Sequence, residues 1–140
     1  GICATAAARN ALSPRTKGVG AVSAQARAYS LSFAAKREIE SPVTTRLADG
    51  MACRTPEPQA LEAIWKYVDR IVEVTDEEVA EAMRAIYECT HNVAEGAGAA
   101  AVAALAKERG VVKDKKVAAV LSGGNVDAAI FSEVLGGARL

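Results

Sequence analysis

Apolar residues in the 140-residue chain alternate between stretches of helical period and short β-branched runs. The clearest stripe follows i, i+3, i+4, i+7 spacing at Leu61, Ile64, Trp65 and Val68. The periodicity predicts helices over residues 2–12, 24–39, 57–70, 75–87, 97–109 and 127–135. The short runs predict strands near residues 17–22, 71–74 and 116–121. Helices that alternate with buried strands indicate an α/β fold, a mostly parallel sheet flanked by helices in three layers.

Local signals mark where several of these helices begin and end. Thr75 precedes Glu78 by three residues, which is the spacing of a capping box at a helix start. Pro14 is expected to stop the first helix, and Gly110 is expected at the C-cap of the helix over residues 97–109. Residues 40–57 contain prolines and a glycine without a sustained period, so we expect a structured loop there.

The continuous apolar run at residues 117–121 predicts a strand that is covered on both faces. Ser122-Gly123-Gly124-Asn125 follows it, and ligands in parallel sheets bind beyond the carboxyl ends of the strands. Ser122 would supply a hydroxyl there, and the glycines would let backbone amides approach a ligand. The alternative is a plain connection, in which the glycines make the turn and Asn125 caps the next helix.

Within residues 92–101, the carboxylate of Glu95 is followed directly by a run of small residues, all glycine or alanine. Such a surface accepts a flat ligand or, equally well, a neighbouring helix. His91, at the end of the preceding helix, is expected to interact with that helix terminus rather than to act as a catalytic base.

Composition narrows the class of protein. The chain is 51% hydrophobic with 31 alanines, so one domain over residues 1–140 with a close-packed core is expected. Its formal net charge of 0 argues against binding to nucleic acid or to an anionic membrane. One histidine and three widely spaced cysteines fit neither a metal site nor a disulfide framework, and we expect a cytoplasmic protein.

Four ordered motifs resemble the threonine dehydratase and serine racemase group of pyridoxal-phosphate enzymes of fold type II. They are Ala48-Asp49-Gly50-Met51-Ala52, the helix at residues 75–83, the segment at residues 92–101, and Ser122-Gly123-Gly124-Asn125-Val126-Asp127. The resemblance extends over nearly the whole chain. It implies that the chain is part of the large domain of that architecture.

The resemblance also implies roles for individual residues. Ser122 would hydrogen-bond the pyridine nitrogen of pyridoxal phosphate, and Glu95 would lie near the edge of the ring. Gly50 and Gly123 would line the cofactor pocket with backbone, and Asn125 would support the turn that carries Ser122. The implied reaction is loss of water from L-threonine or L-serine, followed by release of a 2-oxo acid and ammonia. A neutral hydroxyl at the ring nitrogen suits such an elimination.

Two motifs of that group have no counterpart in this sequence: the Ser-x-Lys-x-Arg segment that carries the Schiff-base lysine, and the glycine-rich phosphate loop. We therefore expect the C-terminal portion of a dehydratase, without the catalytic-lysine region, without catalytic residues and inactive alone. A non-catalytic relic of the fold and a small-ligand-binding α/β module remain as alternatives. An exposed sheet edge would favour a homo-oligomer.

Overall fold

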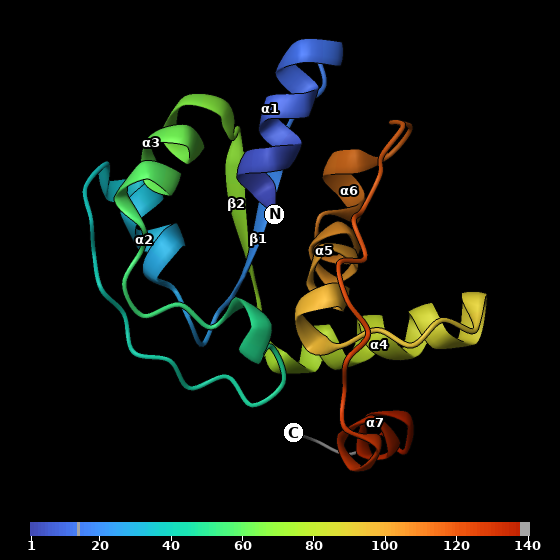
Figure 1. Cartoon of the computed structure of the whole chain (residues 1–140). Coiled ribbons are helices and arrows are strands. Elements are labelled where there is room, and N and C mark those ends of the chain that lie inside the picture. Colours follow the sequence, from blue (N-terminus) through green and yellow to red (C-terminus); the bar gives the residue numbers. More distant parts are fainter. Residues whose placement is uncertain (14, 138–140) are drawn as a thin grey trace.

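The computed structural model describes residues 1–13 and 15–137, and within them a two-stranded parallel sheet forms the centre of the fold (Figure 1). Strand β1 (Val19–Ser23) pairs with β2 (Arg70–Val74) in a register that joins Val19 to Arg70 and Ser23 to Val74. Helices α1, α2 and α3 lie on one side of the sheet, and α5 lies on the other with α4 behind it. The predicted α/β fold with a parallel sheet between helical layers is therefore confirmed.

The helices are α1 (Ile2–Leu12), α2 (Ala28–Ala35), α3 (Pro58–Tyr67), α4 (Asp76–Thr90), α5 (Gly96–Lys107), α6 (Arg109–Val112) and α7 (Ala128–Leu135). A short 3₁₀ turn, η1 (Asp49–Met51), lies within the long loop predicted for residues 40–57. The helices expected over residues 2–12, 57–70 and 127–135 are confirmed to within a few residues, while Pro14 lies outside the described residues. No helix in the described ranges is long and apolar enough to cross a membrane.

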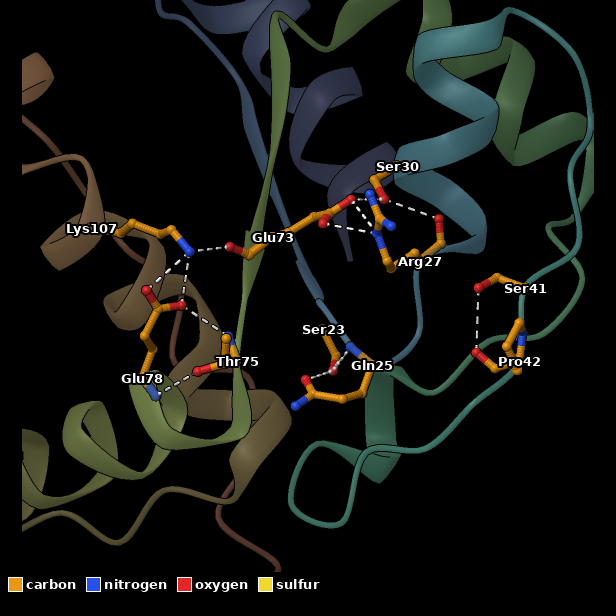
Figure 2. Close-up of polar contacts among 10 residues, drawn as sticks. All are labelled: Ser23, Gln25, Arg27, Ser30, Ser41, Pro42, Glu73, Thr75, Glu78 and Lys107. Carbon is orange, nitrogen blue, oxygen red and sulfur yellow. Dashed lines mark hydrogen bonds and ion pairs between the residues drawn. The ribbon is translucent and has the colours of Figure 1, made fainter. Parts of the chain in front are cut away.

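The capping box at the start of α4 is confirmed. The Thr75 hydroxyl accepts a hydrogen bond from the Glu78 amide at 3.2 Å, and the Glu78 carboxylate accepts one from the Thr75 amide at 2.9 Å (Figure 2). Lys107, at the end of α5, donates to that carboxylate at 3.0 Å and to the Glu73 carbonyl at 2.9 Å. One local motif thus also joins α4, α5 and β2.

Small side chains build the core, as the alanine content indicates. Helix α5 packs against α4 and against both strands through buried alanines: Ala99, Ala100, Ala103 and Ala104. Larger side chains on the facing elements fill the space that the alanines leave, and Val74, Val79 and Met83 are fully buried. Close approach of α5 to its neighbours is therefore a consequence of the alanine-rich sequence.

Charged side chains fasten β2 to the helices on both sides. Burial by itself would raise the pKa of the Glu73 carboxyl, but hydrogen bonds from Ser30 and Arg27 outweigh burial, so this pKa lies below its ordinary value of 4.5 (Figure 2). At the other end of β2, a hydrogen bond from Arg70 lowers the pKa of the Glu108 carboxyl. Both carboxylates are stabilised in the charged form.

The helix predicted over residues 24–39 is shorter, and α2 covers only Ala28–Ala35. Before it, the Ser23 side chain accepts from the Gln25 amide at 3.1 Å and forms a turn (Figure 2). After it, Lys36 is left-handed with φ of 53°, and the Ser32 hydroxyl accepts from the Ile39 amide at 2.8 Å. These serine contacts compete with helical hydrogen bonds, which explains the error.

The prediction of Gly110 as a C-cap is wrong. Helix α5 ends at Lys107, and Gly110 lies inside the four-residue helix α6. The carboxylate of Glu108 bonds Arg70 on β2, and the Glu108 carbonyl accepts from the amides of Val111 and Val112. The Arg70–Glu108 ion pair therefore lies at the break between α5 and α6, two residues before Gly110.

The predicted strand near residues 116–121 is also wrong. These residues form no ladder, and Val117, Val120 and Leu121 are 50%, 61% and 42% exposed. In the described part of the chain, β1 and β2 pair only with each other, and the segment after α6 runs past α5 (Figure 1). An apolar run becomes a strand only beside another strand, and this run has none there.

Candidate functional site

Three segments meet beyond the carboxyl ends of β1 and β2. They are the loop that carries η1, the start of α5, and the extended residues 122–125 that precede α7 (Figure 1). Asp76, two residues after the end of β2, hydrogen-bonds the loop before η1. The meeting point is therefore on the side of a parallel sheet where ligands bind.

Glu95 joins these segments. It is the N-cap residue of α5, and its backbone amide donates to the Gly123 carbonyl at 3.1 Å. Its side-chain Oε2 accepts from the Asn125 amide at 3.2 Å. Both the backbone and the side chain of Glu95 thus hold the segment that follows Ser122.

The two predicted pocket glycines lie beside the same carboxylate. A Cβ added to Gly50 would lie 3.7 Å from Glu95 Oε1 and 3.1 Å from the Ala97 Cβ. A Cβ added to Gly123 would lie closer than 3.0 Å to Glu95 Oε1, a separation that real Cβ atoms do not show. The expected convergence of Gly50 with Glu95 is therefore observed, and Gly123 and Asn125 share it.

The small residues of α5 admit neighbouring backbone. A Cβ on Gly96 would overlap the Leu47 carbonyl oxygen, and a Cβ on Gly98 would overlap the Gly123 carbonyl oxygen. A flat ligand or a helix was expected beside residues 92–101, and the structure instead places two non-helical backbone segments there, one at Leu47 and one at Gly123. Each lies against a glycine of the first turn of α5.

Ser122 is exposed, and its hydroxyl has no hydrogen-bond partner in the described residues. It directly precedes Gly123, the residue whose backbone lies against the Glu95 carboxylate. The alternative for Asn125 is wrong, because the N-cap of α7 is Asp127. The backbone of Asn125, rather than its side chain, makes the contact with Glu95.

His91 takes no part in this arrangement. It adopts the left-handed conformation at the end of α4, with φ of 58°, and its Nδ1 lies 3.1 Å from the Tyr87 carbonyl oxygen. The prediction that it interacts with the helix terminus is confirmed. Within the described ranges, no group of three histidine, cysteine or acidic side chains is placed to hold a metal ion.

Thr45 and Asp76, two residues that support the site, were not identified from the sequence. Asp76 is 5% exposed and accepts hydrogen bonds from the Thr45 hydroxyl and from the Arg46 amide. An acidic residue in the first turn of a helix is common, because it interacts favourably with the helix dipole. Only its burial in the structure distinguishes Asp76 from Glu77 and Glu78 beside it.

Comparison with known sequences identifies relatives of this chain. The sequence profile of the pyridoxal-phosphate dependent enzyme family matches residues 1–123. The chain is 45% identical over 89 residues to an L-threonine ammonia-lyase of Thermotoga maritima. It is 37% identical over 122 residues to an L-threonine ammonia-lyase of Geobacter sulfurreducens. The two matches include 64% and 87% of this chain, respectively. They span only 22% and 30% of the length of the two relatives.

Solved structures show the same fold. The processed form of threonine deaminase isoform 2 from Solanum lycopersicum matches 99% of this chain with a TM-score of 0.90 and 25% identity. Maize serine racemase matches 97% of it with a TM-score of 0.84 and 26% identity. The chain spans 41% and 43% of those two proteins. Because the family profile covers most of its length, the chain belongs to the pyridoxal-phosphate dependent enzymes.

Proposed function

We propose that this chain is the C-terminal part of a pyridoxal-phosphate-dependent L-threonine or L-serine dehydratase. Among the structural observations, the one that carries most weight is the meeting of Gly50 and Gly123 beside the Glu95 carboxylate, in the segment that follows the exposed Ser122. Relatives named L-threonine ammonia-lyase support the same activity. The chain spans less than a third of either relative. The activity is therefore proposed for the protein that the complete open reading frame encodes, which is called the whole protein below.

The residues present fit one side of a heteroaromatic cofactor. Ser122 offers a neutral hydroxyl that has no hydrogen-bond partner among the described residues, and Gly50 and Gly123 present backbone beside the Glu95 carboxylate. Glu95 is held by two backbone contacts, so its carboxylate has a defined position. Ser122, Gly123, Asn125, Glu95 and Gly50 are the residues that we propose to hold pyridoxal phosphate.

Pyridoxal phosphate, when bound, supplies the electron sink for removal of the α-proton and the β-hydroxyl of a hydroxy amino acid. Ser122 would hold the ring nitrogen by a hydrogen bond without a full opposite charge. The Glu95 carboxylate would keep residues 123–125 against α5 and so hold the Ser122 hydroxyl in place. The products would be a 2-oxo acid and ammonia.

The sequence contains no Ser-x-Lys-x-Arg segment, so we propose that the Schiff-base lysine is not among the seven lysines of this chain. A lysine amine placed in the pocket is required for covalent binding of the cofactor. Residues 1–140 alone are therefore expected to bind pyridoxal phosphate weakly and to release no 2-oxo acid. Trapping of the cofactor on one lysine of this chain, with 2-oxobutanoate formed from threonine, would show the opposite.

Exposed apolar residues support a further part of the proposal. Val117, Val120 and Leu121 lie on one segment and are each more than two-fifths exposed. Exposed apolar runs of this kind favour association. We propose that the whole protein is a cytoplasmic homo-oligomer with a small-molecule amino-acid substrate, and that it uses no nucleic acid or membrane partner.

The test is to express the whole protein and to measure 2-oxobutanoate and pyruvate formed from L-threonine and L-serine. Ser122→Ala should lower kcat more than it weakens pyridoxal-phosphate binding, because a contact felt mainly in the transition state appears in the rate. Ser132→Ala, on the exposed surface of α7, is the matched control. Cofactor binding without turnover would favour a non-catalytic relic, and no cofactor binding would favour a different small-ligand module.

A further inference from the structure

The buried carboxylate of Asp76 lies outside the candidate site and binds the loop that leads to Gly50. Asp76 Oδ1 accepts from the Thr45 hydroxyl at 2.6 Å, and Oδ2 accepts from the Arg46 amide at 2.7 Å. The Thr45 hydroxyl in turn accepts from the Ala48 amide at 3.0 Å. A single side chain at the start of α4 therefore organises three residues of the loop that leads to Gly50, two directly and Ala48 through Thr45.

This loop has little freedom once it is bound to Asp76. Leu47 and Ala48 are buried, and the Leu47 carbonyl lies against Gly96 so closely that no side chain fits between them. The Ala48 carbonyl accepts from the Met51 amide at 3.1 Å and forms η1. The position of Gly50 beside Glu95 and Ala97 thus follows from the contacts of Thr45 and Asp76.

We infer that Thr45 and Asp76 are positioning residues that hold the Ala48-Asp49-Gly50 turn opposite Glu95 and thereby set the affinity for the cofactor. This inference rests on the proposed function for its ligand, pyridoxal phosphate. Neither residue is placed against the cofactor. They act through the backbone of the turn, whose Gly50 surface would face it.

A purely structural role of the Thr45–Asp76 pair would lower the stability of the fold without changing the affinity of the folded protein. The two roles are separated by variants of Thr45 in the whole protein. Thr45→Val removes the hydroxyl at nearly constant shape, and Thr45→Ser retains it. Thr44→Val is the matched control, because Thr44 is exposed and, among the described residues, its side chain has no hydrogen-bond partner; its backbone amide donates to the Gln25 carbonyl.

The dissociation constant of pyridoxal phosphate, from absorbance titration of folded protein, should rise about tenfold in Thr45→Val. That change corresponds to about 1.4 kcal/mol. Thr45→Ser and Thr44→Val should stay within about twofold of the parent protein, since each keeps the hydroxyl of Thr45. Asp76→Asn should weaken binding too, and combining it with Thr45→Val should add little, because both changes break the same contact.

Hydrogen exchange of the backbone amides gives a second reading that needs no cofactor. Thr45→Val should speed exchange at Arg46 and Ala48, whereas amides of residues 92–98 should change less. If Thr45→Val does not fold, Asp76→Asn provides both measurements. Unchanged affinity in Thr45→Val, or equal weakening in Thr45→Ser, would overturn the inference. A parent protein that binds no pyridoxal phosphate would instead refute the proposed function, and unchanged exchange at Ala48 would refute the positioning itself.

Discussion

Two short apolar runs differ in structure: residues 71–74 form part of β2, whereas residues 117–121 form no strand. In the first run, Val72 and Val74 are 8% and 0% exposed, and their backbone pairs with β1. In the second, Val120 is 61% exposed and the backbone lies outside any ladder. The two runs are similarly apolar, so composition did not decide between them. Formation of a strand therefore depends on an adjacent strand as much as on the strand's own sequence.

The two regions around these runs differ in the same way. Around β2, the elements are joined by a capping box, three ion pairs (Arg27–Glu73, Arg70–Glu108 and Lys107–Glu78) and a core of small side chains. The segment from residue 113 to residue 127 is attached mainly at Gly123 and Asn125, through Glu95. Stability should therefore be concentrated in the body formed by β1, β2, α4 and α5, and matched substitutions in body and segment test this.

The largest contrast is expected from truncation of apolar side chains. Met83→Ala removes a fully buried side chain of α4 and should lower the free energy of unfolding by about 2–5 kcal/mol. Val120→Ala, in the exposed segment, should change it by less than about 0.5 kcal/mol. Urea denaturation followed by circular dichroism measures both. Similar losses for the two variants would contradict the comparison.

Two glycines of α5 give a sharper test, because they lie in one helix and face the two regions. Gly96→Ala would drive a methyl group into the Leu47 carbonyl, which Asp76 and Thr45 hold in place, and should cost about 3 kcal/mol. Gly98→Ala meets the Gly123 carbonyl, which one hydrogen bond from the Glu95 amide holds in place, and should cost less, about 1–2 kcal/mol. The same denaturation experiment applies, with Gly110→Ala as the control whose added Cβ meets open space. An equal cost at Gly96 and Gly98 would show that the segment is as firmly held as the loop.

Helix caps provide a smaller contrast. Thr75→Ala removes the hydroxyl that accepts from the Glu78 amide, and should lower the unfolding free energy by about 1 kcal/mol. Asp127→Ala, at the start of α7, should cost about 0.3 kcal/mol, because its side chain makes no capping bond and contributes only through the helix dipole. Thermal unfolding of the two variants measures the difference. A larger loss in Asp127→Ala would contradict the assignment of the capping box to the stable body.

The smallest expected effect is a pH dependence that arises in the body. Hydrogen bonds and charge hold the pKa of Glu73 below its ordinary value of 4.5, so the folded protein binds this proton less readily than the unfolded chain. The stabilisation is therefore present above pH 4.5 and is lost as the pH falls through the lower pKa of the folded state. Glu73→Gln should remove this part of the acid sensitivity, about 0.2–1 kcal/mol for a partly exposed ion pair.

Unfolding free energies between pH 3 and pH 7 provide the measurement for Glu73→Gln. Glu62→Gln, on the exposed face of α3, is the control for loss of one carboxylate. If Glu73→Gln retains the full slope of the parent chain below pH 4.5, the contacts of Arg27 and Ser30 do not stabilise the charged form as described.

Short motifs predicted which residues lie together near the candidate site, but not how those residues contact one another. Gly50, Glu95, Gly123 and Asn125 were identified from short motifs, and the structure brings these four together. The motifs gave no indication that the Glu95 carboxylate accepts from the Asn125 backbone, or that Asp76 holds the loop before Gly50. Those contacts join residues about 30 positions apart, so no local pattern records them.

Local sequence was sufficient for features whose physical causes lie within one or two turns of chain. The apolar stripe of α3 and the capping box at Thr75 and Glu78 each follow from residues that are close neighbours. Contacts between distant segments account for other features: residues 71–74 join a ladder while residues 117–121 do not, α5 ends at Lys107, and Thr45 bonds Asp76. Hydrogen-bond ladders, ion pairs and buried carboxylates need partners from distant segments, and the free energy of such contacts exists only once the chain has brought the partners together.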